Sequence, residues 1–264
     1  MKLTGHTALI TGATQGVGAA IARAMATAGA DLVLHGLADT PDAQRVASDC
    51  RALGVKVDVV WGDLSGPTMP AIQGLTQQVD AVAPQVDLLV NNAGGYFDVP
   101  FLELDYDTFE KTMRLNVFSY FWLTHHYARR WVERRVAGRV LMVGSINGRL
   151  AERTHAAYDT SKGAVEMMVK TLCAELAGKG IRVNGLAPGL FWTPLTAPAL
   201  RDPQVLSWMK LHTPNGEVPG PEAAGEAAVF LMSDAAAHIH GHMLMVDGGM
   251  SVWQQPDPPG EVRP

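Results

Sequence analysis

A glycine-rich turn between a short apolar run and a helix-favouring run constrains the fold more than any other stretch of the chain. Residues Thr7–Thr11 are a short apolar run with β-branched members, Gly12–Gly18 reads Gly-Ala-Thr-Gln-Gly-Val-Gly, and Ala19–Ala28 favours a helix. Glycines permit a tight turn and close backbone approach, and the N-terminus of the following helix presents free amides and a partial positive charge. This order of elements predicts a nucleotide-phosphate cradle.

The same alternation continues along the chain. Apolar runs predict further strands at Asp31–His35, Val55–Trp61, Asp87–Asn91, Arg139–Val143, Ile181–Ala187 and His242–Val246. Helix-favouring segments between them cover Pro41–Leu53, Met69–Val82, Tyr106–Arg135, Ala156–Leu176 and Glu222–Met232. We therefore predict an α/β chain with a single-domain, doubly wound Rossmann fold: a parallel seven-stranded sheet with helices on both faces, and a ligand at the carboxyl ends of the strands.

The segment Leu190–Pro221 lacks regular periodicity and is interrupted by Pro194, Pro198, Pro203, Pro214, Pro219 and Pro221. A loop of this length is more often a lid than a tether. We expect one dinucleotide-binding domain over residues 1–253, with a substrate lid at about 190–221. Residues 254–264 form a polar, Pro-rich C-terminal tail.

Charge and apolar patterning exclude several classes of function. The net charge is −5 and no basic stripe is present, which argues against nucleic acid as a partner. No apolar run reaches membrane-spanning length, and residues 1–6 have no signal-peptide layout, so we expect a cytoplasmic protein without a membrane partner. Cys50 and Cys173 are far apart in helix-like segments and are expected to be reduced core thiols.

Tyr158 and Lys162 stand one helical turn apart, which sets a phenol and an ammonium on one helix face. A free tyrosine titrates near pKa ~10 and is a poor base at neutral pH. At ~4 Å and an effective dielectric of ~20, an ammonium contributes roughly 4 kcal/mol, on the order of 3 pKa units before desolvation. The pair can therefore act as a proton shuttle, although a solvated Tyr beside a solvated Lys has the same spacing.

Other motifs complete a recognisable set. In order along the chain stand Thr11-Gly12-x-x-x-Gly16-x-Gly18, Asn91-Asn92-Ala93-Gly94, Asn116, Ser145, Tyr158-x-x-x-Lys162, Pro188-Gly189 and Asp247-Gly248-Gly249. Together they resemble the short-chain dehydrogenase/reductase family over about residues 5 to 250, including the 13-residue step from Ser145 to Tyr158. The resemblance implies an NAD(P)-dependent oxidoreductase that moves a hydride between a secondary alcohol or its carbonyl and a nicotinamide cofactor, with no metal.

The resemblance also implies catalytic roles. Tyr158 would be the general acid/base, and Lys162 would lower its pKa and hold the nicotinamide ribose. Ser145 would hydrogen-bond the substrate oxygen, and Asn116 would hold a water near Lys162 in a proton relay. The alternative is a catalytically silent NAD(P)-binding sensor or scaffold, which would have no reason to retain these four residues together.

For the cofactor, the resemblance implies contacts from Gly12, Thr14, Gln15, Gly16, Val17, Gly18, Gly36, Asp63, Leu64, Asn92, Ala93, Gly94, Tyr158, Lys162, Pro188, Gly189 and Thr193. Family members that use NADP often carry a base where Gln15 or Leu37 stands. Neither base is present, and the acid that many NAD users carry at the position of Gly36 is also missing. Without a counter-charge a 2′-phosphate would be poorly held, so NAD is favoured over NADP.

Substrate contacts are expected from Tyr96, Ser145, Asn147, Arg149, His155, Phe191 and Trp192, with Glu152 and Trp253 as further candidates. Their polar share favours a small-molecule sugar, polyol or hydroxy acid. The sequence His238-Ile-His240-Gly-His242 looks like a metal cluster, but it has no nearby carboxylate or Cys, so a structural or subunit-contact role is expected. The resemblance further implies a homotetramer or homodimer that packs partly through the two long helices.

Overall fold

The computed structural model of the chain describes residues 1–252; Trp253 and the expected tail at 254–264 lie outside the described residues. Seven strands, all parallel, form one sheet in the order β3-β2-β1-β4-β5-β6-β7. They are β1 Thr7–Ile10, β2 Asp31–Gly36, β3 Val57–Trp61, β4 Leu88–Asn91, β5 Arg139–Val143, β6 Arg182–Pro188 and β7 Met243–Val246. The predicted doubly wound, seven-stranded parallel sheet is confirmed.

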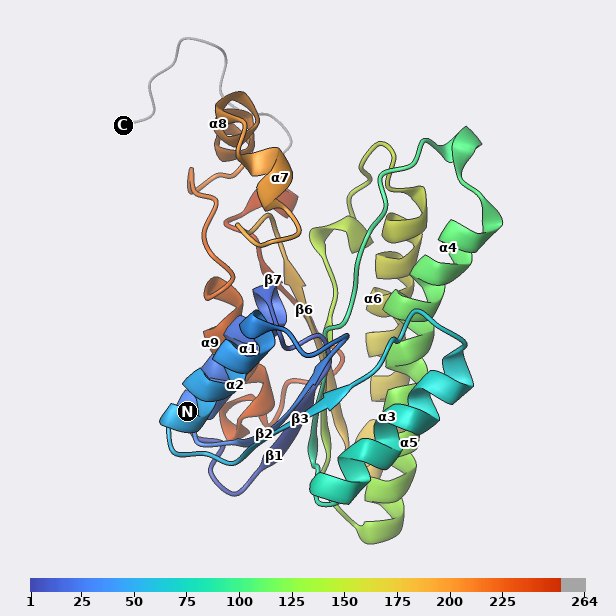
Figure 1. Cartoon of the computed structure of the whole chain (residues 1–264), viewed down its shortest axis with the longest axis vertical. Helices are drawn as coiled ribbons and strands as arrows, with labels where there is room; N and C mark the ends of the chain where they lie inside the picture. Colours follow the sequence, from blue (N-terminus) through green and yellow to red (C-terminus); the bar gives the residue numbers. More distant parts are fainter. Residues whose placement is uncertain (253–264) are drawn as a thin grey trace.

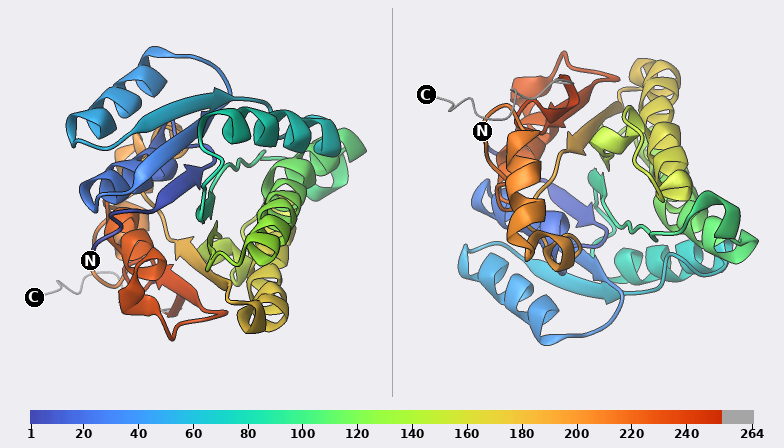
Figure 2. Two further views of the ribbon diagram at one scale, coloured as in Figure 1. Left: turned by 90° about the horizontal axis from the view of Figure 1, so that it is seen from below. Right: turned by 90° about the horizontal axis from the view of Figure 1, so that it is seen from above.

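Helices cover both faces of the sheet (Figures 1 and 2). One layer holds α1 Gly16–Thr27, α2 Pro41–Ala52 and α9 Ala223–Met232, and the other holds α3 Thr68–Val82, α4 Tyr106–Met113, α5 Ser119–Arg134 and α6 Ala156–Leu176. None of the helices within residues 1–252 is long and apolar enough to cross a membrane. The strand order reverses between β1 and β4, and such a switch point opens a crevice at the carboxyl ends of the strands.

Strand β1 shows how the sequence divides the core between the two layers. Successive side chains of a strand point to opposite faces, so Ile10 packs with the α1 and α9 layer while Leu9 packs with the α3 and α5 layer. Both are fully buried. A strand buried on both faces needs a largely apolar run, as in the fully buried strands β1 and β4.

The region expected as one helix over Tyr106–Arg135 is divided. A π-helical turn at Arg114–Phe118 separates α4 from α5 and has the fully buried Asn116 at its centre. The Asn116 side chain bonds to the backbone of Gly95, outside the helix, and inserting such a contact requires a wider turn. The segment is therefore helical as expected, but Asn116 interrupts the regular α-helix.

The segment 190–221 was predicted to be irregular, but it contains two helices, α7 Ala197–Leu200 and α8 Pro203–Leu211. Pro198 and Pro203 lie in the first turn of these helices, where the missing N–H costs nothing. Asp202 caps α8 by accepting a hydrogen bond from the backbone N–H of Gln204 (2.8 Å). Both helices stand beyond the carboxyl ends of the strands (Figures 1 and 2).

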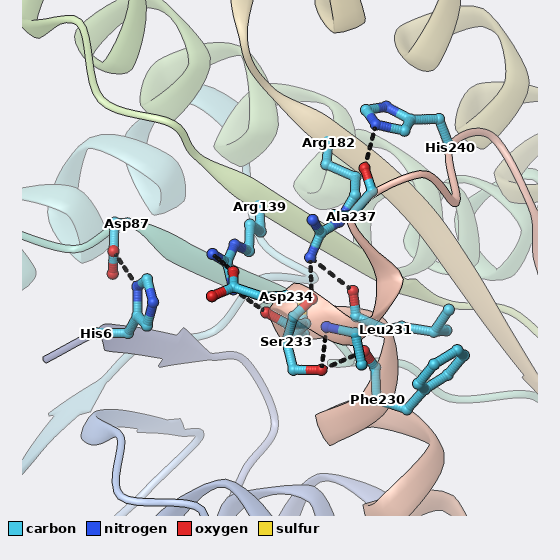
Figure 3. Close-up of polar contacts among 12 residues, drawn as sticks. His6, Asp87, Arg139, Arg182, Phe230, Leu231, Ser233, Asp234, Ala237 and His240 are labelled. Atoms are coloured by element: carbon cyan, nitrogen blue, oxygen red, sulfur yellow. Dashed lines mark hydrogen bonds and ion pairs between the residues drawn. The ribbon is translucent and has the colours of Figure 1, made fainter. Parts of the chain in front are cut away.

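Two arginines stabilise the opposite end of the sheet from the cavity, where strands β5 and β6 begin. Arg182 donates hydrogen bonds to the carbonyls of Leu231 and Ser233, and Arg139 donates to the carbonyl of Met232 and pairs with Asp234 (Figure 3). These carbonyls lie at the C-terminus of α9, where the helix dipole places a partial negative charge. The two guanidinium groups are therefore stabilised there. Burial lowers the pKa of Arg182.

The three histidines at 238, 240 and 242 lie near this end of the sheet, just before β7 begins. His240 Nε2 is 3.2 Å from the carbonyl of Ala237 (Figure 3), and the backbone N–H of His242 donates to Asn184. Within residues 1–252, no group of three or more His, Cys, Asp or Glu side chains could hold a metal ion.

The two cysteines are both free thiols. Cys50 is buried on α2, and Cys173 is half-buried on α6. Burial raises the pKa of Cys50 to about 11, so its thiol is protonated at neutral pH. Both placements agree with the expectation of core thiols.

Candidate active site

A cavity of about 840 Å³ lies at the carboxyl ends of the strands. Its wall includes the β1–α1 loop, the ends of β3 to β6, the start of α6 and the segment 190–221. Such a volume is typical of a site for a cofactor and a small molecule. Of the residues expected in the site, all line this cavity except Gly36, Asn116, Arg149 and Trp192.

The β1–α1 loop leaves space that side chains would fill. Gly12 has φ of +62°, and a Cβ there would lie 2.8 Å from the Cα of Ala93. A Cβ on Gly18 would lie 2.2 Å from the carbonyl oxygen of Gly12. Helix α1 begins at Gly16 without a side-chain cap, so its first-turn amides remain available to an anion. The loop therefore fits a pyrophosphate.

Hydrogen bonds hold this loop against the end of β4. Thr11 Oγ1 accepts from the backbone N–H of Asn92 (2.9 Å) and of Ala93 (3.0 Å). In return, Asn92 Nδ2 donates to the carbonyls of Thr11 (2.9 Å) and Gly12 (3.0 Å). The cradle is thus fixed before any ligand binds, which reduces the entropic cost of binding.

We expect Gly18→Ala to weaken cofactor binding by at least about tenfold, because the new methyl group displaces the Gly12 carbonyl and the Asn92 amide. The matched control is Gly74→Ala in α3, where nothing lies within 4 Å of the added methyl. Removing a helical glycine stabilises by about 0.5–1 kcal/mol, so the control should melt at the same or a higher temperature and bind normally. Equal cofactor affinity in both variants would contradict the cradle.

His35, at the end of β2, supports the loop and was missed by the sequence reasoning. Its Nδ1 accepts from the backbone N–H of Gly12 (3.3 Å), and its Nε2 donates to the carbonyl of Gly62 (3.0 Å). Burial lowers the pKa of His35 to about 4, so the ring is neutral and this tautomer can persist at physiological pH.

The next two residues explain the unusual end of β2. A Cβ on Gly36 would lie 2.5 Å from Thr14 and 2.8 Å from the Trp61 ring, so close packing requires glycine and leaves no room for an acid. Leu37 is 70% exposed and lines the cavity without a charge. Across from it, hydrogen bonds from Ser65 lower the pKa of Asp63, which keeps this carboxylate ionised.

Tyr158 and Lys162 project from the first turns of α6 and both line the cavity. Burial raises the pKa of Tyr158 to about 12, while a hydrogen bond with Ser145 acts in the opposite direction. Lys162 Nζ donates to the carbonyl of Val143 (3.0 Å) and lies 5.6 Å from the centre of the Tyr158 ring. Burial lowers the pKa of Lys162 to about 8. Burial is thus the largest effect on the pKa of Tyr158, and it acts opposite to the lowering expected from Lys162.

Asn116 lies behind the cavity wall. Its amide donates to the carbonyl of Gly95 (2.9 Å) and to Ser161 Oγ (3.0 Å), and its Oδ1 accepts from the N–H of Gly95 (3.1 Å). Ser161 Oγ donates in turn to the carbonyl of Tyr158 (2.6 Å). The side chain therefore joins the exit of β4 to the turn of α6 that carries the tyrosine.

An aromatic cluster surrounds the Tyr158 ring. Tyr96 and His155 lie edge-to-face with ring centroids 4.8 Å apart, and they are 5.7 Å and 5.9 Å from the Tyr158 ring. His155 is 8% exposed, with Asp98 at 2.6 Å from Nε2 and Glu152 at 3.0 Å from Nδ1. Asn147 Nδ2 donates to Asp159 (2.9 Å), which holds the loop after β5 against α6.

Two residues expected in the substrate pocket lie elsewhere. The Arg149 guanidinium pairs with Glu166 at 2.9 Å, and hydrogen bonding to this carboxylate raises the pKa of Arg149. Trp192 is 40% exposed, and its backbone N–H donates to the carbonyl of Pro219. Neither lines the cavity, although their sequence neighbours Leu150, Phe191 and Thr193 do. Trp253 lies outside the described residues.

Helix α8 supplies a wall that the sequence reasoning missed. Val205, Trp208, Met209 and His212 all line the cavity, and their spacing is i, i+3, i+4, i+7. This spacing, preceded by Asp202-Pro203, is a helix signal that is readable in the sequence. Further lining residues that were not expected include Lys111, Leu150, Ala151, Leu195 and Met250.

Comparison with known proteins agrees with this geometry. The model of the family described as enoyl-(acyl carrier protein) reductase matches residues 12–251. Galactitol 2-dehydrogenase (L-tagatose-forming) of Cereibacter sphaeroides is 37% identical over 256 residues, which cover 96% of this chain and 97% of the relative. The 5-keto-D-gluconate 5-reductase of Escherichia coli is 32% identical over 252 residues, which cover 95% of this chain and 97% of the relative.

A solved structure extends the likeness to three dimensions. The gluconate 5-dehydrogenase from Burkholderia cenocepacia, in complex with NADP and tartrate, superposes with a TM-score of 0.88 at 33% identity, covering 96% of this chain and 98% of that one. The match spans the sheet, the cradle and the Tyr158–Lys162 helix together, because it runs over nearly the whole chain. The protein therefore belongs to the short-chain dehydrogenase/reductase family of nicotinamide-dependent oxidoreductases.

Proposed function

We propose that the protein oxidises a secondary alcohol group of a polar substrate, or reduces the matching carbonyl, with Tyr158 as the general acid/base. One observation carries this proposal: Ser145, Tyr158 and Lys162 line the same cavity that contains the glycine cradle. The names of the relatives, galactitol 2-dehydrogenase and 5-keto-D-gluconate 5-reductase, describe reactions at hydroxyl or keto groups of polar molecules.

In the oxidative direction, Tyr158 accepts the proton of the substrate hydroxyl as the C–H bond breaks. Ser145 donates a hydrogen bond to the substrate oxygen and stabilises the charge that develops there. Lys162 stabilises the phenolate through its positive charge, and its hydrogen bond to Val143 holds the ammonium in place. The nicotinamide ring supplies the hydride acceptor or donor when the cofactor is bound. In the reductive direction, Tyr158 returns the proton.

The side chain of Asn116 keeps these groups aligned. Its three hydrogen bonds join Gly95 to Ser161, one helical turn from Tyr158 and adjacent to Lys162. We therefore propose a positioning role for this side chain, in addition to the water-holding relay that the family resemblance implies. Segment 190–221, with α7 and α8, is the proposed lid, because its apolar side chains face the cavity.

We propose that the cofactor is held by Gly12, Thr14, Gln15, Gly16, Val17, Gly18, Asp63, Leu64, Asn92, Ala93, Gly94, Lys162, Pro188, Gly189 and Thr193, which all line the cavity. NAD remains the preferred form. Of the described residues in the cavity wall, the only Lys or Arg side chains are Lys111 and Lys162, and neither follows β2. The NADP bound to the relative from Burkholderia cenocepacia makes this preference a point to test.

We expect NADH to bind about tenfold more tightly than NADPH, and Leu37→Arg to reverse the order, because a guanidinium there would pair with a 2′-phosphate. Fluorescence titration with both reduced cofactors measures this. Leu37→Met, which adds no charge, is the control and should keep the wild-type order. Tighter NADPH binding by the wild type would overturn the preference for NAD.

The activity itself is tested by NADH formation from a panel of secondary alcohols, polyols, sugars and hydroxy acids at alkaline pH. Alkaline pH favours oxidation, because the Tyr158 phenolate is the reacting base and the pKa of Tyr158 is raised to about 12. Cofactor binding without turnover of any member would favour the alternative of a silent sensor or scaffold.

We further propose a cytoplasmic homodimer or homotetramer. The free thiols of Cys50 and Cys173 are typical of a reducing compartment. On α5 and the turn before it, Phe118 and Phe121 are 39% and 41% exposed, which leaves an aromatic surface for a second subunit.

A further inference from the structure

The substrate end of the cavity, beside Tyr158, carries carboxylates but few cations. Glu152 lines the wall, and its carboxylate lies 3.0 Å from His155 Nδ1. The carboxylate of Asp98 lies 2.6 Å from the other ring nitrogen of His155. With His155 protonated this group of three carries one net negative charge, and with His155 neutral it carries two. The wall is therefore electronegative in either state.

The effect of these charges reaches the reacting phenol. After burial, the causes that raise the pKa of Tyr158 are the nearby charges of Asp159 and Glu152 together with the Tyr96 phenol. Asp98 and Glu152 likewise raise the pKa of Tyr96, again after burial. Tyr158 and Tyr96, which both line the cavity, thus share the negative field of Glu152.

The cations that could offset this field lie elsewhere. Lys162 is held by the Val143 carbonyl beside the phenol that it serves. Lys111 is stacked against the Phe97 ring at 5.3 Å, and its charge acts on Asp63, at the β3 end of the cavity. Arg149, expected from the sequence in the pocket, is paired with Glu166 outside it.

His212 on α8 is the remaining basic group of the described wall on the lid side. Its Nδ1 lies 2.7 Å from the carbonyl of Trp208, and its ring stacks on the Trp208 ring at 3.9 Å. In this arrangement Nδ1 donates to the Trp208 carbonyl, so only Nε2 remains to contact a ligand.

Resting on the proposed function, we propose that this site selects uncharged polyols and sugars over sugar acids. Substrate hydroxyl groups donate hydrogen bonds to the Glu152 carboxylate, which strengthens the contact because one partner is charged. The carboxylate of an aldonate would instead face Glu152, with Asp98 on the other side of the His155 ring and no dedicated cation. Glu152 and Asp98 are then specificity-determining residues for the reaction at Tyr158.

The test compares kcat/KM for matched pairs, each an alditol and the aldonate of the same configuration: galactitol with galactonate, and glucitol with gluconate. We expect the wild type to favour the alditol by about tenfold or more, which corresponds to one like-charge contact at a partly exposed site. Raising the ionic strength should raise kcat/KM for the aldonate and leave the alditol unchanged, since salt screens only the charged substrate.

Glu152→Gln and Asp98→Asn are nearly isosteric and remove one charge each, Glu152 from the cavity wall and Asp98 from beside His155. Both should reduce the preference for the alditol severalfold and flatten the salt dependence. The matched control is Glu175→Gln, which removes a charge from an exposed position at the far end of α6 and should change neither quantity.

The outcomes separate this proposal from the one on which it rests. Turnover with a preference for aldonates, or an alditol preference that survives both substitutions unchanged, overturns the charge selection and leaves the oxidoreductase intact. If the wild type prefers the aldonate and His212→Gln loses this preference, the substrate carboxylate binds to His212 on the lid. If NAD binds but no member of either pair reacts, the proposed oxidation of polar alcohols fails as well.

Discussion

Replacing Tyr158 by phenylalanine is expected to lower kcat by a factor of about 10³ or more, because general acid–base catalysis contributes about 10²–10⁴ and the cavity wall presents no second phenol bonded to Ser145. Cofactor affinity should remain within a few fold of the wild type. The phenyl ring fills the same volume, so the contacts with Tyr96 and His155 persist. Steady-state kinetics and a cofactor titration measure the two effects separately.

The same substitution at Tyr127 is the matched control. Tyr127 is buried on α5, and among the described residues its hydroxyl has no hydrogen-bond partner. Removing an unpartnered buried hydroxyl is neutral or stabilising, so Tyr127→Phe should keep full activity and an equal or higher melting temperature. If Tyr158→Phe retained more than about a tenth of kcat, another group would have to move the proton.

The architecture was predictable because it depends on local patterns that survive in tertiary context. Each buried parallel strand needs a continuous apolar run, and each crossover needs a helix, so the βα alternation from Thr7 to Val246 fixes the sheet type. The glycines of the cradle and the Tyr158–Lys162 spacing are also local. Their partners in the structure lie where a doubly wound sheet brings loop ends together.

What failed depended on long-range contacts. The π turn at Asn116 forms because its amide bonds to Gly95, 21 residues away, and no periodicity within the helix signals that contact. Arg149 was expected in the pocket because of its position after Ser145, yet its side chain finds Glu166 on the adjacent helix. The direction of a side chain in a loop is set by such partners, which the sequence does not reveal.

Helix α8 is a different case, because its signal was present. Six prolines in the segment 190–221 suggested an irregular loop, but Pro203 follows the capping residue Asp202, where proline starts a helix rather than ending one. Read from Pro203, the apolar positions at 205, 208 and 209 have helical spacing. Their side chains face the cavity and not the core, so the helix buries none of its residues.

The second large effect is expected from Lys162→Met, which should abolish most activity and yet stabilise the cofactor-free protein at neutral pH. Lys162 is 4% exposed, and burial lowers its pKa from 10.5 to about 8. The unfolded chain therefore binds this proton more tightly than the folded one. Below pH 8 the full cost of burying the charge applies, and it diminishes as the pH rises toward 10.5. The methionine carries no such cost.

From this shift, the variant should exceed the wild type by on the order of 3 kcal/mol in free energy of unfolding at pH 7, and by only about 1 kcal/mol at pH 10. Urea titrations of both proteins at the two pH values measure the difference. Lys170→Met, on the exposed face of the same helix, should show a small difference that does not vary with pH. A Lys162→Met protein that is less stable than the wild type at pH 7 would mean that the ammonium's bond to Val143 outweighs its desolvation. The lysine would then support the fold as well as the phenolate, and its retention would need no catalytic explanation.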